Sequence, residues 1–168
     1  MINFSLSINN QPTAIRYPRD LAGDYREEKS FQKLKLGKGK VVKKGKKIAF
    51  LNLGTRLNQI FETSDLILKK FKIQPTIVDM RFAKPIDTSI IKSLIENHDV
   101  IVTIEENSIG GFSAQVNHFI LNNLEKSPRI LNFFMKDEFI DQSDINDQYD
   151  QSGISPEKII KKLASLLK

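Results

Sequence analysis

The chain has 168 residues, the size of one ordinary domain with a short extension, and is long enough to bury a sizeable core. Hydrophobic residues make up 40% of it, and no apolar run approaches the ~20 residues that cross a bilayer, so no membrane span is predicted. It contains no cysteine and no basic segment followed by an apolar stretch near its start. These features predict a soluble protein of a reducing cytoplasm, without disulfides or thiolate metal sites.

The net charge of +6 is unevenly distributed along the chain. Residues 33–72 contain twelve basic and two acidic residues, a local charge of +10, whereas residues 99–150 contain three basic and ten acidic residues, a local charge of −7. The basic run at residues 40–47 has no interleaved aromatic residue and no zinc-ligand spacing. A solvated face is the favoured interpretation, a surface for an acidic partner remains open, and no nucleic-acid partner is predicted.

The first 35 residues are predicted to form a short segment and a linker. Residues 1–10 are polar and show no clear period, and residues 12–18 predict a strand because β-branched and aromatic residues lie between prolines. Residues 20–35 are charged with little periodicity, as in a linker. We therefore place a domain boundary near residue 32.

Beyond this boundary, strand and helix patterns alternate. The predicted strands are residues 39–44, 47–53, 75–80, 99–104 and 129–134, and the predicted helices are residues 57–71, 87–95, 112–124 and a last helix that begins after Ser155. Such alternation is typical of a parallel sheet covered on both faces. The predicted fold is α/β: a mostly parallel sheet of about five strands with helices on both faces, preceded by a remnant strand.

Glu105 and Glu106 end one predicted strand. Adjacent carboxylates can serve as an acid and a base when burial moves their pKa values apart. Consecutive residues at a strand end point in opposite directions, however, so the two cannot both face one substrate. Capping of neighbouring loop amides is the favoured role, and catalysis and a subunit contact remain open.

Gly110 and Gly111 precede the helix predicted at residues 112–124. Bare glycines at a helix N-terminus form an anion site in principle. The spacing is not that of a dinucleotide-binding loop, and no Walker lysine follows. Close packing of the turn is the favoured role.

The remaining polar candidates also favour structural roles. His98 and His118 have no ligand-spaced partners, so no metal site is predicted. Arg81, Lys84 and Asp87 follow a strand through a proline-containing turn, where ion pairs and amide hydrogen bonds that lock the connection are favoured over an interface role.

Five segments, taken in order, carry a resemblance to a known family: Arg-Tyr-Pro-Arg at 16–19, Leu-Gly-Lys-Gly at 36–39, Leu-Asn-Leu-Gly-Thr at 51–55, Val-Asp-Met-Arg-Phe-Ala-Lys-Pro-Ile-Asp at 78–87, and Val-Thr-Ile-Glu-Glu-Asn at 102–107 with Gly-Gly-Phe at 110–112. Together they resemble the last third of the 1-deoxy-D-xylulose-5-phosphate synthase family, within the wider transketolase family. The R-F-x-K-P-x-D form favours this synthase over the β subunits of pyruvate dehydrogenase E1. The resemblance implies that residues 1–32 are the end of a pyrimidine-binding domain plus a linker, and that residues 33–168 are a transketolase C-terminal-like domain.

The family's activity follows from the same resemblance. Its members are transferases that condense pyruvate with glyceraldehyde 3-phosphate and release CO₂, which starts the methylerythritol phosphate route of isoprenoid biosynthesis and supplies thiamine biosynthesis. They use thiamine diphosphate and Mg²⁺ and work as dimers. The family's diphosphate-binding domain, its G-D-G…N motif and its aminopyrimidine-activating Glu have no counterpart in this sequence. The resemblance therefore implies a chain that binds no cofactor or metal, has no catalytic residue, and is active only with a dimer mate or a chain that carries the thiamine diphosphate-binding domains.

One functional residue of the family matches a residue of this chain. The Arg of the family's Y-P-R-G motif binds the phosphate of the small phosphorylated substrate, and it falls on Arg19, whose planar donor fork suits phosphate. The Gly that follows in the family is Asp20 in this chain. The resemblance implies a cytoplasmic protein, with a plastid-type organelle as the other location.

A second function, of a different class, is a non-catalytic interaction or assembly module, or a relic, derived from a thiamine diphosphate-dependent enzyme. Because domains of this family bury a face against their dimer mates, we expect an exposed apolar patch on the isolated chain.

Overall fold

The structure, a computed structural model, describes residues 1–15 and 34–167. The chain divides into two compact units, Met1–Leu36 and Gly37–Lys168. The second unit contains all five strands that are found in the described residues.

The described part of the first unit holds one helix, α1 (Ile2–Ser5), which the sequence did not predict. The strand predicted at residues 12–18 is wrong for residues 12–15, which are irregular and pair with no strand of the described residues. Residues 16–18 lie outside the described residues. A strand is stable only when a neighbour accepts its backbone hydrogen bonds, and the β-branched pattern alone does not supply one. None of residues 1–15 is buried, so this segment has no core of its own.

The second unit is built on a single five-stranded sheet, in the order β1-β3-β2-β4-β5. Its strands are β1 (Lys40–Lys43), β2 (Lys47–Asn52), β3 (Thr76–Asp79), β4 (His98–Ile104) and β5 (Arg129–Phe133). Strands β2, β3, β4 and β5 are parallel, and β1 pairs with β3 in the antiparallel sense. The predicted mostly parallel sheet is confirmed.

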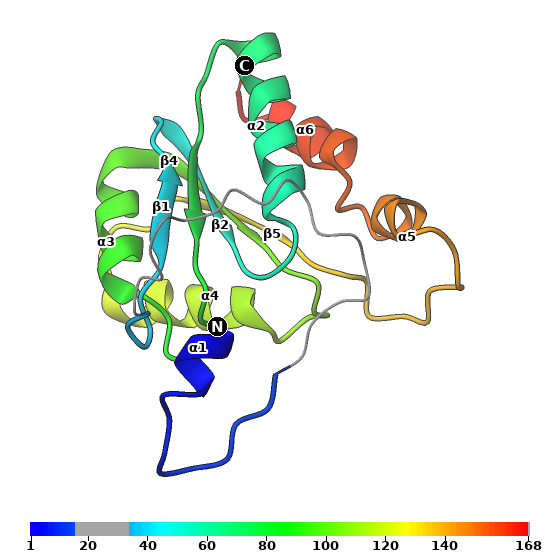
Figure 1. Cartoon of the computed structure of the whole chain (residues 1–168). Coiled ribbons are helices and arrows are strands. Elements are labelled where there is room, and N and C mark those ends of the chain that lie inside the picture. The colour runs from blue at the N-terminus through cyan, green and yellow to red at the C-terminus, as the bar shows by residue number, and fades with distance from the viewer. Residues whose placement is uncertain (16–33, 168) are drawn as a thin grey trace. The chain divides into compact units, whose positions relative to one another are not determined.

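Helices cover both faces of the sheet (Figure 1). On one face lie α2 (Leu57–Phe71), α5 (Ile145–Gln151) and α6 (Pro156–Ala164), and on the other lie α3 (Thr88–Asn97) and α4 (Phe112–Asn123). Alternate residues of β2 feed the two cores: Ile48 and Phe50 pack under α2 and α6, whereas Ala49 and Leu51 pack under α3 and α4. Within the described residues, no helix is both long and apolar enough to cross a membrane.

The parallel strands give the sheet two different ends. At one end, which we call the carboxyl edge, β2, β3, β4 and β5 all finish, so the loops that follow them gather there. At the other end, the amino edge, the same four strands begin. Ligand sites of open parallel sheets lie at the carboxyl edge, where the strands deliver their last side chains.

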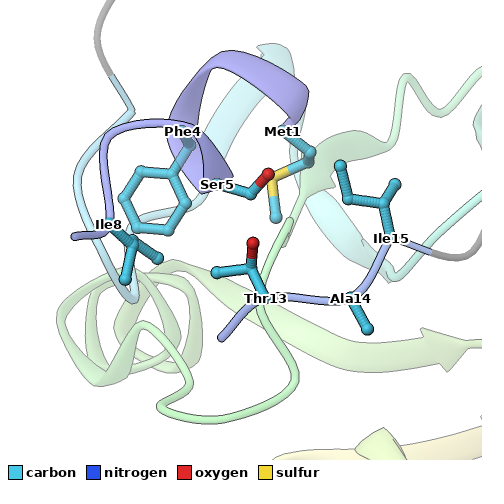
Figure 2. Close-up of a pocket in the computed structure, with 7 residues that line it drawn as sticks. All are labelled: Met1, Phe4, Ser5, Ile8, Thr13, Ala14 and Ile15. Atoms are coloured by element: carbon cyan, nitrogen blue, oxygen red, sulfur yellow. The ribbon is translucent and has the colours of Figure 1, made fainter. Parts of the chain in front are cut away.

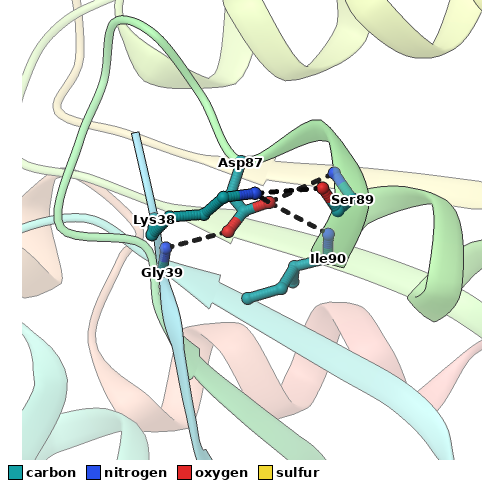
Figure 3. Close-up of polar contacts among 5 residues, drawn as sticks. All are labelled: Lys38, Gly39, Asp87, Ser89 and Ile90. Atoms are coloured by element: carbon teal, nitrogen blue, oxygen red, sulfur yellow. Dashed lines mark hydrogen bonds and ion pairs between the residues drawn. The ribbon is translucent and has the colours of Figure 1, made fainter. Parts of the chain in front are cut away.

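Asp87 ties the start of the domain to helix α3 (Figure 3). One carboxylate oxygen accepts hydrogen bonds from the backbone N–H groups of Ser89 and Ile90, at 3.1 and 3.2 Å, as a helix N-cap does. The other accepts from the N–H of Gly39, at 3.1 Å, and the ammonium of Lys38 lies 3.3 Å from the first oxygen. The prediction that residues 81–87 lock their connection by ion pairs and amide hydrogen bonds is confirmed at Asp87.

The pKa of Asp87 reflects these four donors. Burial alone would raise it, but the hydrogen bonds from Ile90 and Gly39 and the charge of Lys38 outweigh burial, so the pKa of Asp87 lies below its ordinary value. A carboxyl group whose pKa is lower in the folded than in the unfolded protein stabilises the fold above the unfolded pKa, and this stabilisation is lost as the pH falls through the folded pKa.

We predict that Asp87→Ala lowers the free energy of unfolding by about 2 kcal/mol at neutral pH, since a cap and a second buried amide lose their acceptor. The difference in the free energy of unfolding between the wild type and Asp87→Ala should shrink below about pH 4, because the wild-type carboxylate then becomes protonated. Urea unfolding between neutral and acid pH measures both effects. Asp65→Ala is the matched control: Asp65 pairs with Lys43 at 2.7 Å but is exposed, so we expect a loss of at most ~1 kcal/mol. An equal loss in the two variants would contradict the capping role of Asp87.

Candidate functional site

The carboxyl edge is the candidate site, and a buried carboxylate lies at its centre. Glu105 follows β4 directly and is fully buried. Its two oxygens accept hydrogen bonds from the backbone N–H groups of Phe112 and Ser113, each at 2.7 Å, and from the side-chain amide of Asn107 at 3.3 Å. The first turn of α4, which has a positive dipole end, is therefore occupied by an anion of the chain itself.

Gly111 is required for this arrangement. It is the N-cap residue of α4, and a Cβ atom built on it would overlap the Oε2 atom of Glu105 and lie 3.1 Å from the Cβ of Asn107. Gly110 has a φ of +94°, which favours glycine. The predicted role of the glycine pair in close packing of the turn is confirmed, and so is the predicted capping role of Glu105.

Glu106 faces a different set of partners, as expected for consecutive residues at a strand end. Its Oε1 atom accepts hydrogen bonds from the hydroxyl of Thr55, in the loop after β2, and from the hydroxyl of Tyr149, in α5. The guanidinium of Arg56 stacks on the ring of Tyr149, 3.6 Å from its centroid. Glu106 thus joins the loops after β2 and β4 to α5.

Arg56 is the unusual member of this cluster because only 1% of it is exposed. Its Nη2 atom donates a hydrogen bond of 2.6 Å to the carbonyl of Ile154, whereas Nε and Nη1 have no partner in the described residues. Burial lowers the pKa of Arg56, against the attraction of Tyr149 and Glu106. Burial, together with the hydrogen bond to Glu106, also raises the pKa of Tyr149 to about 12. No sequence motif pointed to Arg56 or Tyr149.

His98 makes structural hydrogen bonds, and His118 is exposed to solvent. The Nδ1 atom of His98 lies 2.9 Å from the carbonyl of Leu94, which can only accept, so Nδ1 carries a proton. The Nε2 atom lies 2.7 Å from the hydroxyl of Thr76. His118 is exposed on α4 and contacts the side chain of Asn122. In the described part of the chain, no group of three His, Cys, Asp or Glu side chains could hold a metal ion.

Two apolar side chains are exposed at the same edge. Ile109, in the loop after β4, is 68% exposed, and Phe139, in the loop after β5, is fully exposed. A hydrogen bond of 2.9 Å from the Ser108 hydroxyl to Asp137 and one of 3.0 Å from the Met135 N–H to the Asn107 carbonyl connect the two loops. Ile109 and Phe139 are thus exposed apolar side chains on two connected loops, and we call them the apolar pair. The expected apolar patch against a dimer mate stays a prediction.

Comparisons with known proteins place this chain in a family. The family model described as "Transketolase, C-terminal domain" matches residues 37–159. The chain belongs to the transketolase C-terminal domain family. It is 38% identical over 157 residues to the 1-deoxy-D-xylulose-5-phosphate synthase of Vibrio parahaemolyticus, and 36% identical over 159 residues to that of Pseudoalteromonas translucida. These matches cover 93% and 94% of the chain but only 24% of each relative, so the chain spans about a quarter of their length.

Solved structures share the fold of this transketolase C-terminal domain. A structure titled "Split gene transketolase, inactive beta4 tetramer" has a TM-score of 0.70 at 23% identity, over 81% of this chain and 43% of that one. A 2-oxoglutarate:ferredoxin oxidoreductase from Magnetococcus marinus has a TM-score of 0.50 at 11% identity, over 78% of this chain and 19% of that one. The sequence relatives are thus synthases that this chain resembles over about a quarter of their length, and these structures support the fold.

The predicted phosphate-binding residue is not among these groups. Arg19 and the neighbouring Asp20 lie outside the described residues, so the role of Arg19 stays a prediction from the family motif. Among the described candidates, Arg81 has a φ of +60° and its Nε lies 3.3 Å from Asp79, while Lys84 is exposed in the following turn. Arg81 and Lys84 thus lie on the β3–α3 connection without contacting Glu105 or Glu106.

We predict that Gly111→Ala and Glu105→Ala each lower the free energy of unfolding by about 2–3 kcal/mol, because either change leaves the amides of Phe112 and Ser113 without their acceptor. The double variant should be little worse than either single variant, since both act on the same contacts. Chemical denaturation of the four proteins gives this double-mutant cycle. Fully additive losses would show that Gly111 acts independently of Glu105.

For the second cluster, we predict that Tyr149→Phe lowers the free energy of unfolding by about 1–2 kcal/mol, as the hydroxyl donor to Glu106 is removed while the ring below Arg56 stays. A tyrosine whose pKa is raised in the folded protein stabilises the fold below its unfolded pKa, and this contribution disappears as the pH rises towards about 12. The wild type should therefore lose stability faster than Tyr149→Phe above about pH 10.

The ultraviolet titration curve of the wild type, minus the curve of the Tyr149→Phe variant, gives the ionisation of Tyr149 alone. The other two tyrosines, Tyr17 and Tyr25, are present in both proteins and cancel. A difference curve centred near pH 10, the ordinary value for tyrosine, would contradict the burial and hydrogen bonding of this hydroxyl.

Proposed function

We propose that this chain is the C-terminal portion, or a separate C-terminal subunit, of a 1-deoxy-D-xylulose-5-phosphate synthase. The observation that carries the proposal is the identity of 36–38% to two such synthases over nearly the whole chain. In this proposal the chain takes part in the condensation of pyruvate with glyceraldehyde 3-phosphate only when a partner chain supplies the cofactor-binding domains. The active assembly is a dimer in the cytoplasm that serves isoprenoid and thiamine biosynthesis.

The chemistry of the carboxyl edge supports the proposal that a partner chain supplies the reacting groups. Glu105 is fully engaged by backbone amides, and Glu106 is engaged by two hydroxyl groups. A general acid or base needs a free site within hydrogen-bond reach of its substrate, and Glu105 provides none because both of its oxygens are committed to the fold. Glu106 is exposed and accepts both hydroxyl groups at Oε1, but a single carboxylate repels a diphosphate and does not bind it. We therefore assign the reacting groups, thiamine diphosphate and Mg²⁺ to the partner chain, since the described residues do not fit these cofactors.

The apolar side chains of the first unit support the proposal that another domain covers them. Its described residues surround an open, largely apolar pocket of about 360 Å³, into which Met1, Phe4, Ile8 and Ile15 contribute side chains (Figure 2). A four-residue helix without buried side chains is not stable in water by itself. We propose that residues 1–32 complete a pyrimidine-binding domain, whose remaining part covers these apolar groups.

The second unit offers a further contact for the partner chain. We propose that the exposed apolar pair, Ile109 and Phe139, packs against it, because exposed aromatic side chains at the centre of an interface supply much of its binding energy. In this arrangement Arg19 contacts the substrate phosphate and the apolar pair contributes affinity between the chains.

A mixing assay tests this proposal. The chain is combined with a separately expressed fragment that carries the two missing domains of a synthase relative, together with thiamine diphosphate, Mg²⁺, pyruvate and glyceraldehyde 3-phosphate. We expect product only on mixing. Arg19→Ala should raise the KM for glyceraldehyde 3-phosphate at least ~10-fold while the complex still forms, because one charge-assisted phosphate contact is lost. Arg129→Ala, at an exposed arginine of β5, is the matched control and should leave activity unchanged.

Phe139→Ser separates binding from chemistry. It should weaken the complex at least ~10-fold and leave the KM for glyceraldehyde 3-phosphate unchanged once the chain is in excess. A complex without activity would instead favour the second function, a non-catalytic assembly module derived from such an enzyme. The absence of both complex and activity would overturn the proposed role as a working subunit.

A further inference from the structure

Six lysines are gathered at the amino edge, opposite the candidate site. They come from the turn between β1 and β2, the first residue of β2, the last turn of α2 and the C-cap of α2. We call them the lysine end: Lys44, Lys46, Lys47, Lys69, Lys70 and Lys72. All six are exposed, and none forms an ion pair with the described residues. Asp65 is paired with Lys43. Asp99 follows His98, the strand partner of Lys47, and makes no ion pair with the described residues.

The lysine end is a fixed surface because backbone contacts hold its two segments together. The N–H of Lys46 donates to the carbonyl of Gln74 at 2.8 Å, and the N–H of Gly45 donates to the hydroxyl of Thr76 at 3.0 Å. Gly45 has no room for a side chain against Pro75. Like charges held close together repel one another, so this arrangement costs stability unless an anionic surface is bound to it.

The same domain carries a surface of the opposite charge. Between α2, α5 and α6 lies a groove of about 390 Å³, and four carboxylates line it, which we call the acidic groove: Glu62, Asp147, Asp150 and Glu157. Asp150 contacts the hydroxyl of Ser155 at 2.8 Å and Lys158 at 3.5 Å, whereas the other three make no ion pair in the described residues. The domain therefore carries unpaired positive charge on one surface and unpaired negative charge on another.

Helix α2 prevents one copy from joining its own two surfaces. Glu62 lies in the first half of this 15-residue helix and Lys69 in its last turn, about 10 Å further along the axis at 1.5 Å per residue. Because the helix is packed on the sheet, the two surfaces keep this separation. The lysine end and the acidic groove of one copy therefore do not pair with each other, and a second macromolecule of opposite charge can pair with either surface.

We propose that the lysine end of one copy of this chain binds the acidic groove of a second copy. The occupant is a second copy because the complementary surface is present on the chain itself, with a volume large enough to admit lysine side chains. A nucleic-acid strand is the less favoured occupant, since the lysine end contains no arginine fork for phosphate and no exposed aromatic ring for base stacking. The contact joins two different surfaces, so each copy keeps one surface free after it binds another, and copies add head to tail.

The test is the average molar mass of the full chain in solution. At about 20 mM salt, where charges interact over ~20 Å or more, we expect the mass to rise above that of a monomer as the protein concentration increases, and to return to the monomer at about 500 mM salt, where screening shortens that range to a few ångströms. Light scattering or sedimentation equilibrium measures both. A chain that stays monomeric at low salt overturns the proposal.

Charge reversal identifies the two surfaces. Lys44→Glu with Lys69→Glu alters only the lysine end, and Glu62→Lys with Asp147→Lys alters only the acidic groove; all four side chains are exposed. Each double variant alone should associate at least ~10-fold more weakly than the wild type. An equimolar mixture should regain salt-sensitive association, because the unaltered surface of each variant then meets the unaltered complementary surface of the other. Circular dichroism confirms that each variant is folded.

The matched control for Lys44→Glu with Lys69→Glu is Lys84→Glu with Lys136→Glu, which makes the same change in net charge at exposed lysines of other loops. It should associate as the wild type does. Equal weakening in the control would show that net charge, not the lysine end, controls association, and failure of the mixture to recover would show that the two surfaces do not meet. Binding of a single-stranded DNA 20-mer by a chain that remains monomeric would likewise overturn the proposal in favour of a nucleic-acid partner.

Discussion

The hydrogen bonds of the Glu105 carboxylate to the first turn of α4 determine how the carboxyl edge is built. A helix that begins immediately above a parallel sheet presents unsatisfied N–H groups to a region from which water is excluded, and each such group is costly. Glu105 follows β4 directly, and its two carboxylate oxygens accept hydrogen bonds from this first turn at 2.7 Å. The same contact excludes a side chain at Gly111 and leaves no vacant anion site at this helix, although its glycine pair and positive dipole end are what an anion site requires.

Strand geometry then directs the next residue elsewhere. Since Glu105 points towards α4, Glu106 points towards the loop after β2 and towards α5, where Thr55 and Tyr149 donate to it. Two adjacent carboxylates, which in an isolated sequence invite an acid–base interpretation, therefore serve two separate structural contacts. Arg56 is buried beside them because its guanidinium stacks on Tyr149 and its positive charge lies in the field of Glu106. The polar residues of this edge therefore hold the loops and helices of the domain together.

The extent to which the sequence predicted this structure depends on how local each signal is. The strand at residues 99–104 and the helix at residues 57–71 were predictable because apolar periodicity is read over the element itself. Asp87 was predictable as a cap because it stands immediately before its helix. Helix α5 was missed, since only Ile145 and Tyr149 are apolar in seven residues and its stability comes from the contact of Tyr149 with Arg56 and Glu106, both distant in the sequence. The strand prediction for residues 12–15 was wrong for the converse reason: a strand-like pattern does not form a strand without a neighbouring strand to pair with.

The same limit applies to charge. A count along the sequence shows a basic and an acidic half, but it does not show that turn residues 44–47 and the last turn of α2 lie at one edge, because the contacts of Gly45 and Lys46 with the segment after α2 bring them together. Edge strands commonly carry lysine to prevent pairing with other sheets, and this explains the lysines of β1 itself. It does not explain Lys69, Lys70 and Lys72, which lie on a helix and its C-cap. Helix-dipole stabilisation accounts for a basic last turn, but it is equally satisfied by one or two cations. The positive charge at this edge therefore exceeds what the end of α2 and the edge strand require. Surface charge of this kind keeps an isolated chain solvated, and the proposed contact between copies would give the same lysines a second role.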